Sequence, residues 1–217
     1  MKKILTLLIL VLSSTVAKAD DDKVSAYLFP QFEKGYVVLK GSSGARVAAL
    51  LNYNMIDERM MYLDSDSSLF ELDASTVIMV SIGARSFIPA RNNAFYEMIK
   101  TGNNEYYISY KSVLISQGKA SGYGSYSQTS SIGNMASVHN TGTWSFISCD
   151  EKYAGVDKST VVIKTEKKYE KVLSLKSLVK IFKNRQTALE TFAKENKTDF
   201  NKLEHVISIV EFAFSHS

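Results

Sequence analysis

The segment 116–142 holds the residues best suited to contact a ligand, because it is rich in Gly and Ser and carries two tyrosines. Tyrosine offers an aromatic ring with a polar tip, while Ser, Thr and Gln offer uncharged donors and acceptors. This mixture predicts a site for a neutral, polar ligand such as a glycan or a peptide. The predicted contact residues are Tyr123, Ser125, Tyr126, Ser127, Gln128 and Thr129. The alternative is that Gly and Ser form a surface connector without a ligand.

A hydrolytic site is a second interpretation of the same segment. It would use one of the serines as nucleophile, His139 as base, and Asp150 or Glu151 to orient the histidine. The run Gly122–Tyr126 lacks the Gly-x-Ser-x-Gly spacing of a nucleophile elbow. We therefore predict no catalytic residue, and a hydrolase acting on envelope or extracellular polymers stays an alternative.

Metal ligands are the next possibility. Asp64–Ser68 alternates oxygen-bearing side chains like the start of a calcium loop. A calcium loop needs Gly at its sixth position and Glu at its twelfth, where this chain has Leu69 and Ser75. The run therefore predicts a turn. The three scattered histidines and the single Cys149 do not have zinc spacing. No metal or other cofactor is predicted.

Two groups of basic residues leave alternatives open. Arg59, Arg85 and Arg91 lie near a predicted hairpin together with Glu58, and they indicate either an anion pocket or solvated sheet edges. The stretch 164–185 is locally rich in Lys and Arg. It indicates either a solvated face of a strand and a helix, or contact with an anion or an anionic surface.

The N-terminal residues have the three parts of a secretory signal: a basic start, the apolar run 4–12, and a small-residue site ending at Ala19. The apolar run is too short to cross a bilayer, so we predict cleavage after Ala19 and no remaining transmembrane segment. The mature protein would be periplasmic or extracellular. Loss of Lys2, Lys3 and Lys18 would lower the net charge from +4 to +1, so no nucleic-acid binding is predicted. With Cys149 alone, no internal disulfide can form.

The elements that would position these residues change in character near residue 174. Residues 27–173 read as β structure, while residues 174–214 have the 3.6-residue apolar period of helices. Ser174 is expected to start the first helix, and Asn201 with Glu204 predicts a capping box for the third. The predicted strands are 36–40, 46–53, 58–63, 69–72, 76–82, 85–88, 106–115, 143–149, 160–164 and 168–173, and residues 94–100 are ambiguous between strand and helix. We predict one α+β domain over residues 20–217, with a mostly antiparallel sheet or barrel-like core followed by about three C-terminal helices.

The chain also resembles a family of uncharacterised exported bacterial proteins. The runs that carry the resemblance are Leu50–Asn54, Ile82–Phe87 and Tyr123–Ser131, with the Lys- and Phe-rich helical tail. The resemblance implies an exported, single-domain, β-rich protein and no particular activity. The resulting expectation is a non-enzymatic binding or interaction protein whose partner is a neutral polar ligand or another envelope protein. A structural envelope component is a further alternative.

Overall fold

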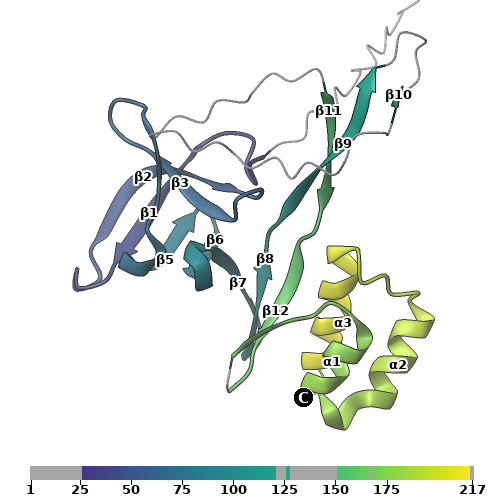
Figure 1. The fold of residues 1–217 in the computed structure, drawn as a ribbon. Helices are drawn as coiled ribbons and strands as arrows, with labels where there is room; N and C mark the ends of the chain where they lie inside the picture. Colours follow the sequence, from purple (N-terminus) through teal and green to yellow (C-terminus); the bar gives the residue numbers. More distant parts are fainter. Residues whose placement is uncertain (1–25, 121–125, 128–150, 167, 216–217) are drawn as a thin grey trace, which may run out of the picture.

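The computed structural model describes residues 26–120, 126–127, 151–166 and 168–215. It contains a ten-stranded antiparallel sheet, a three-stranded sheet and three C-terminal α-helices (Figure 1). The predicted α+β class, with a mostly antiparallel sheet and helices at the end, is confirmed. The strand order of the large sheet is β13-β12-β8-β7-β6-β5-β1-β2-β3-β4.

Most strands follow the predicted segments closely. The ambiguous residues 94–100 lie in a strand, β7, which pairs with β6 on one side and β8 on the other. The predicted run 106–115 is divided between β8 and β9 at Tyr110 and Lys111. The strands of the large sheet are β1 (Glu33–Leu39), β2 (Arg46–Asn54), β3 (Arg59–Leu63), β4 (Leu69–Glu71), β5 (Val77–Ile82), β6 (Arg85–Pro89), β7 (Phe95–Thr101), β8 (Asn104–Ser109), β12 (Thr160–Lys164) and β13 (Tyr169–Lys171).

The predicted two-residue hairpin between β5 and β6 is confirmed. Ile82 pairs directly with Arg85, so Gly83 and Ala84 form the loop. Gly83 has φ +56°, a left-handed conformation that glycine adopts without a side-chain clash.

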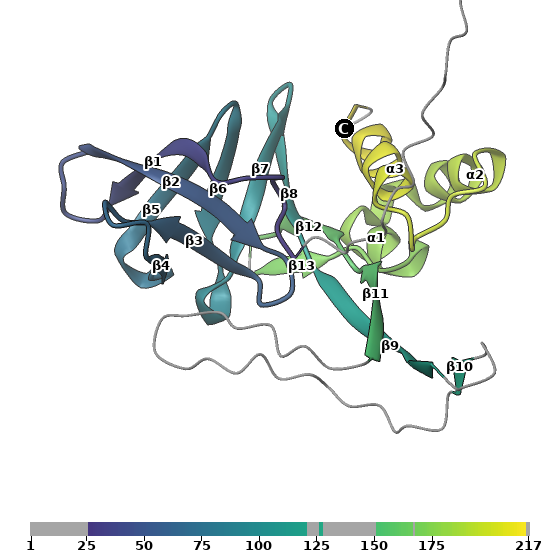
Figure 2. The same cartoon turned by 90° about the horizontal axis from the view of Figure 1, so that it is seen from above.

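The first core cluster lies between strands β1 to β7, which curl around it (Figure 2). We call it the sheet core. Its largest fully buried members come from four different strands, β2, β3, β6 and β7. These residues are Leu51, Tyr53, Met60, Phe87 and Phe95.

A second cluster, the helix core, lies between strands β8 and β12 and the three helices. Tyr106 and Val161 supply the strand side, and Leu178, Leu189 and Ile209 supply one residue from each helix. Tyr110 packs against both clusters, so the two cores are joined through one side chain as well as through the shared sheet.

Helix α1 (Leu175–Ile181) begins where the sequence predicts. The Ser174 hydroxyl accepts from the Ser177 backbone N–H at 3.2 Å, and the Ser177 hydroxyl oxygen accepts from the Ser174 backbone N–H at 3.0 Å. This is a reciprocal capping box. A 3₁₀ turn, η3 (Lys183–Arg185), leads from α1 into helix α2 (Gln186–Glu195).

The capping box predicted for the third helix is wrong. Helix α3 (Leu203–Ser215) begins two residues after Asn201. The backbone N–H and the side-chain amide of Asn201 both donate to the carboxylate of Asp199, at 2.9 and 3.0 Å. Asn201 is therefore part of a turn that precedes the helix.

The smaller sheet forms an arm that projects from the large one (Figure 1). Strand β9 (Ser112–Ala120) follows β8, pairs with β11 (Glu151–Asp157), and β11 leads into β12. Residues 116–120 are thus in a strand and not in a loop as predicted. The short strand β10 (Tyr126–Ser127) pairs with the outer end of β9.

Candidate functional site

The predicted contact residues of segment 116–142 are only partly within the described structure. Tyr126 and Ser127 form β10, in register with Ala120 and Lys119. The other four, Tyr123, Ser125, Gln128 and Thr129, lie outside the described residues, as do His139, Cys149, Asp150 and the predicted strand 143–149. Whether this segment contacts a ligand stays a prediction.

A better-defined candidate lies at one end of the large sheet, in a groove of about 480 Å³. This volume is within the range of small-molecule sites, roughly 300–1,000 Å³. The turn between β6 and β7 forms one wall, and the turn between β12 and β13 forms the other. We call this site the basic groove. The lining side chains used below are Arg91, Tyr96, Lys164, Glu166, Lys168 and Tyr169.

Tyrosine rings form the floor of the basic groove. The rings of Tyr96 and Tyr169 meet edge to face with their centroids 5.9 Å apart. Below them, the Tyr107 ring meets Tyr169 at 5.2 Å and is itself buried. Tyr169 remains 40 % exposed, so its ring is available to a ligand. Burial raises the pKa of Tyr96, so its hydroxyl is a neutral donor at physiological pH.

The wall that carries Arg91 is fixed by hydrogen bonds. Arg91 begins a 3₁₀ turn, η2 (Arg91–Asn93), whose two asparagines have left-handed backbones with φ near +60°. Arg59 Nη1 donates to the Asn92 carbonyl at 2.6 Å, and the Asn93 side-chain oxygen accepts from the Ala74 backbone N–H at 2.6 Å. These bonds attach the turn to segments far away in the sequence, so Arg91 projects from a rigid support.

The opposite wall is fixed by Thr165. Its backbone N–H and its hydroxyl both donate to the Lys168 carbonyl at 2.8 Å. Lys164 is paired with Tyr169 in the antiparallel register, directly beside the floor of the groove. The turn therefore holds Lys164 and Lys168 on either side of Tyr169, and both side chains are exposed.

The described lining residues give the basic groove a positive charge, with three cations and one carboxylate, Glu166. Lys168 Nζ lies 3.8 Å from Glu170 Oε1, a weak and exposed pair. Arg91 and Lys164 form no ion pair within the described residues. An anion that entered the groove would therefore meet cations without displacing a strong internal partner.

The structure does not bring the three predicted arginines into one pocket. Arg85 makes a bidentate pair with Glu97, with N–O distances of 2.7 and 2.8 Å. Arg59 Nε lies 3.0 Å from Glu71 Oε1. Of the three arginines, Arg91 alone lines the basic groove, where it is joined by Lys164 and Lys168 from the basic stretch 164–185.

Sequence reasoning did not identify Tyr96 or Tyr169 as site residues. Tyr169 could have been identified from its position within the basic stretch. An aromatic residue that lies between lysines on a short edge strand is not expected to contribute to a hydrophobic core. Tyr96 gave no such signal, since it lies in the segment whose secondary structure was ambiguous. Tyr106 and Tyr107 are buried, and Tyr110 packs against both cores.

The other predicted sites resolve into structural roles. The Asp64 carboxylate accepts from the backbone N–H groups of Asp66 and Ser68, both at 2.9 Å, which is the predicted turn. His205 Nδ1 accepts from the Asp199 backbone N–H at 3.1 Å. In the part of the chain that the structure describes, no three His, Cys, Asp or Glu side chains are grouped to hold a metal ion. Nor does any described helix have the length and apolar character needed to cross a membrane.

Comparisons of this chain with protein-family models, with curated proteins and with solved structures found no match. The functional argument therefore depends on the chemistry of the basic groove.

Proposed function

We propose that this chain is an exported, non-enzymatic binding protein and that the basic groove is its site for an anionic ligand. The observation that carries the proposal is the meeting of Arg91, Lys164 and Lys168 around the rings of Tyr96 and Tyr169. Export is supported by the secretory pattern of residues 1–19.

The residue types suit an anion with a partly apolar body. The planar guanidinium of Arg91 matches the two oxygens of a carboxylate or phosphate, while the two lysines act as point charges. The tyrosine rings give contact area at a small entropic cost, and their hydroxyls add hydrogen bonds. Hydrogen bonds at Asn92, Asn93 and Thr165 hold described parts of both walls, which reduces the ordering needed when the ligand enters.

Binding is favoured over turnover by the residues that line the groove. Among the described residues, the lining includes no His, Cys or Ser, and the hydroxyl of Thr165 is used by the turn itself. A nucleophile with an adjacent base is the usual requirement for hydrolysis through a covalent intermediate. The anionic ligand proposed here differs from the neutral one expected for segment 116–142, which remains a separate predicted contact.

The test is a calorimetric titration of the purified protein with small anions, namely galacturonate, glucose 6-phosphate and succinate. The variant Arg91→Gln/Lys164→Gln/Lys168→Gln removes the three cations and should weaken binding of the best of these at least about tenfold. Tyr169→Ala should also weaken it, whereas Tyr169→Phe should do so less.

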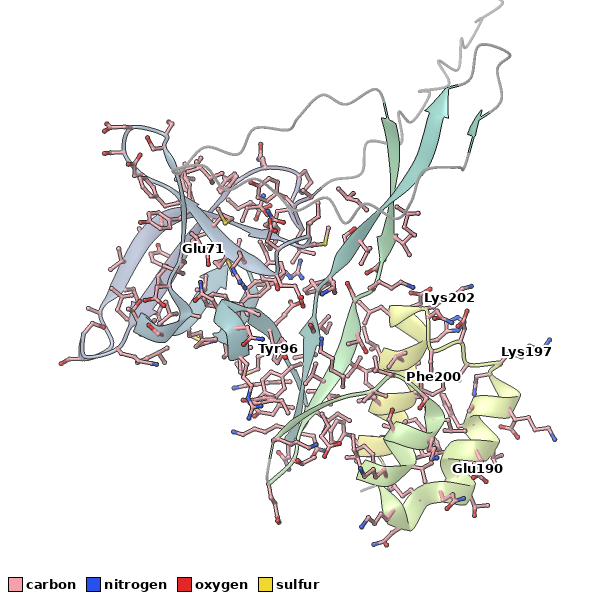
Figure 3. All side chains as sticks on the ribbon, in the orientation of Figure 1. Glu71, Tyr96, Glu190, Lys197, Phe200 and Lys202 are labelled. Atoms are coloured by element: carbon pink, nitrogen blue, oxygen red, sulfur yellow. The ribbon has the colours of Figure 1, made fainter. Side chains whose placement is uncertain are left out.

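A matched control removes the same charge elsewhere. Lys194, Lys197 and Lys202 are exposed, and Figure 3 shows the latter two on the side of the helices away from Tyr96. The variant Lys194→Gln/Lys197→Gln/Lys202→Gln should bind as the wild type does. Equal weakening by both triple variants, or no binding of any of the three anions, would contradict the proposal.

A further inference from the structure

A second pocket, of about 340 Å³, opens beside the sheet core between β1, β2 and β3. These three strands are neighbours in the large sheet (Figure 2). The volume is within the range of small-molecule sites. We call this site the apolar pocket. Its apolar wall includes Val37, Leu39, Val47, Ala49, Tyr62 and Leu72.

The wall of the apolar pocket lies on the face of the sheet that carries the sheet core. Val37 is buried and is paired in register with Val47, so both side chains lie on that face, yet Val47 is 50 % exposed. Tyr62 is paired with the buried Leu51. The ring of Phe70 stacks on Tyr62 with the centroids 5.6 Å apart and is 42 % exposed. Neighbouring apolar side chains that face a core and still contact solvent indicate a site for an apolar group.

A small residue on β2 leaves space for the apolar pocket. Ala49 lies between Val47 and Leu51 on the core face of the strand, and it packs against the sheet core. Protein interiors are otherwise close-packed, with few voids larger than a water molecule. A larger side chain at this one position would therefore fill part of the pocket.

The polar lining of the apolar pocket comes from a single turn, the one after β3. Asp64 and Ser65 supply it. Asp64 Oδ1 accepts both hydrogen bonds of the turn, and Asp64 Oδ2 accepts none within the described residues. The described lining includes no Lys or Arg. Of the cations next to the wall in sequence, Lys40 Nζ donates to the Ser75 carbonyl at 2.8 Å, and Arg46 lies on the opposite face of β2.

We infer that the apolar pocket binds one alkyl chain of an amphiphile whose cationic head group pairs with Asp64. The wall is mostly aliphatic and crosses two strand spacings, roughly 10 Å, so an extended chain can lie across the three strands. Because the polar lining comes from one turn, the ligand needs one polar group only. The carboxylate of that turn favours a cation over an anion at this place. This second site and its ligand are independent of the basic groove.

The experiment titrates the purified protein with pentylamine, heptylamine and nonylamine by calorimetry, each below its micelle concentration. Affinity should rise about fourfold for each methylene that the pocket buries. Ala49→Leu should weaken the binding of nonylamine at least about tenfold, because the leucine takes up the space of the ligand. Val47→Gln should also weaken it, and this change at a half-exposed residue does not depend on filling the pocket.

A matched control adds the same side chain elsewhere. Ala188 is exposed on α2, on the other side of the molecule from β2 (Figure 1). Ala188→Leu should bind nonylamine as the wild type does. Far-UV circular dichroism and the thermal midpoint check that each variant is folded.

The head group is tested on the variant Arg91→Gln/Lys164→Gln/Lys168→Gln, in which the basic groove has lost its cations for an anion. Nonylamine and decanoate carry the same nine-carbon chain, and the amine should bind this variant roughly two- to fivefold more tightly. Adding Asp64→Asn should remove the difference, while the asparagine oxygen can still accept the bonds of the turn. Adding Glu190→Gln, at an exposed residue of α2, should leave the difference unchanged.

Several results would overturn the inference. They are an affinity that does not rise from pentylamine to nonylamine, binding of nonylamine by Ala49→Leu and Val47→Gln that equals the wild type, and decanoate binding as tightly as nonylamine. If sedimentation shows a dimer that Ala49→Leu dissociates, a second copy of the chain occupies the pocket and the inference also fails. The small-anion titration of the basic groove is separate, so each site can fail without the other.

Discussion

Glu97 is a charged residue in the interior of the sheet, only 5 % exposed. Its carboxylate accepts two bonds from the Arg85 guanidinium and a third, at 2.7 Å, from the Tyr110 hydroxyl. The Arg85 guanidinium also lies 4.9 Å from the centre of the Phe29 ring. Both carboxylate oxygens of Glu97 thus have partners, which is the condition under which a buried charge is tolerated.

Removing the carboxylate alone should therefore be costly. Glu97→Ala is expected to lower the free energy of unfolding by about 3–5 kcal/mol, because Arg85 is left without its partner. The pair Arg59–Glu71 is more exposed, so Glu71→Ala should cost about 1 kcal/mol or less from that pair. Urea unfolding measures both. A loss for Glu97→Ala no larger than that for Glu71→Ala would contradict this account.

Asp73 provides a prediction about pH. Its carboxylate accepts from the hydroxyl and from the backbone N–H of Ser75, both at 2.8 Å, and these bonds hold the pKa of Asp73 below its ordinary value. A pKa lowered by folding gives stability that is present above the unfolded pKa, near 4, and is lost as pH falls through the folded value. Asp73→Asn should therefore have a lower thermal midpoint than the wild type at pH 7. The difference should shrink as the pH is lowered to 3.

The comparison for Asp73 is Asp66, whose side chain accepts no hydrogen bond within the described residues. Asp66→Asn should leave the thermal midpoint nearly unchanged at both pH values. A deficit of Asp73→Asn that is the same at pH 7 and pH 3 would show that the charge of Asp73 is not involved.

Single residues could be assigned from sequence where the interaction is local. Ser174 was predictable as a cap because its partner, Ser177, lies three residues away. Asn201 was not, because the carboxylate of Asp199, two residues before it, competes with Glu204, three residues after it, and the sequence does not show which interaction forms. Arg91 was identified as a possible anion contact, but its neighbours Lys164 and Lys168 could not be connected with it.

At the scale of elements, β1 has a glycine where no other residue fits. Gly35 is paired with Ala49 on β2 and with Ile82 on β5. A Cβ at this position would lie 2.4 Å from the Ser81 carbonyl oxygen and 2.8 Å from a methyl group of Leu51. Since backbone lies on one side, the strand could accept a methyl group only by moving.

Gly35→Ala should therefore lower the free energy of unfolding by at least about 2 kcal/mol, as overpacking of a core does. A comparison is Gly83→Ala, where a Cβ would meet open space and only the left-handed φ opposes it. That change should cost roughly 1 kcal/mol. Urea midpoints test the order, and a smaller loss for Gly35→Ala than for Gly83→Ala would contradict the close approach.

Strands with β-branched and aromatic residues were predictable as elements, and Val77–Ile82 is the clearest of them. The extension of β9 beyond Ile115 was not predictable, because it depends on pairing with β11. The sequence of β11, Glu151–Asp157, has no regular apolar alternation of its own. Its strand conformation follows from pairing with a neighbour, which is a tertiary effect.

At the scale of the whole molecule, the two cores share one sheet and one side chain, Tyr110. We therefore expect them to unfold together. Met60→Ala in the sheet core and Leu178→Ala in the helix core should each lower stability by about 2–5 kcal/mol, since both residues are fully buried. Hydrogen exchange should show protection falling in β1–β3 and in the helices alike for either variant. Loss confined to one core in either case would show that the cores unfold separately.

The basic groove belongs to this largest scale, and for that reason the sequence could not predict it. Its walls come from the β6–β7 turn and the β12–β13 turn, and they meet because β12, which follows the arm in sequence, returns to pair with β8 in the large sheet. No local pattern shows that β12 returns to β8. The fold class was predictable because it depends on the types and order of elements, whereas the groove depends on which strands are neighbours.

The strand order has one more consequence. The two outermost strands of the large sheet, β4 and β13, are only three residues long, and both carry charged side chains. If a strand of a second molecule paired with either edge, the two strands could form too few backbone hydrogen bonds for a stable intermolecular sheet. Neither edge of the large sheet therefore favours the addition of another strand. At high protein concentration, we expect no fibrils to form by pairing at these edges.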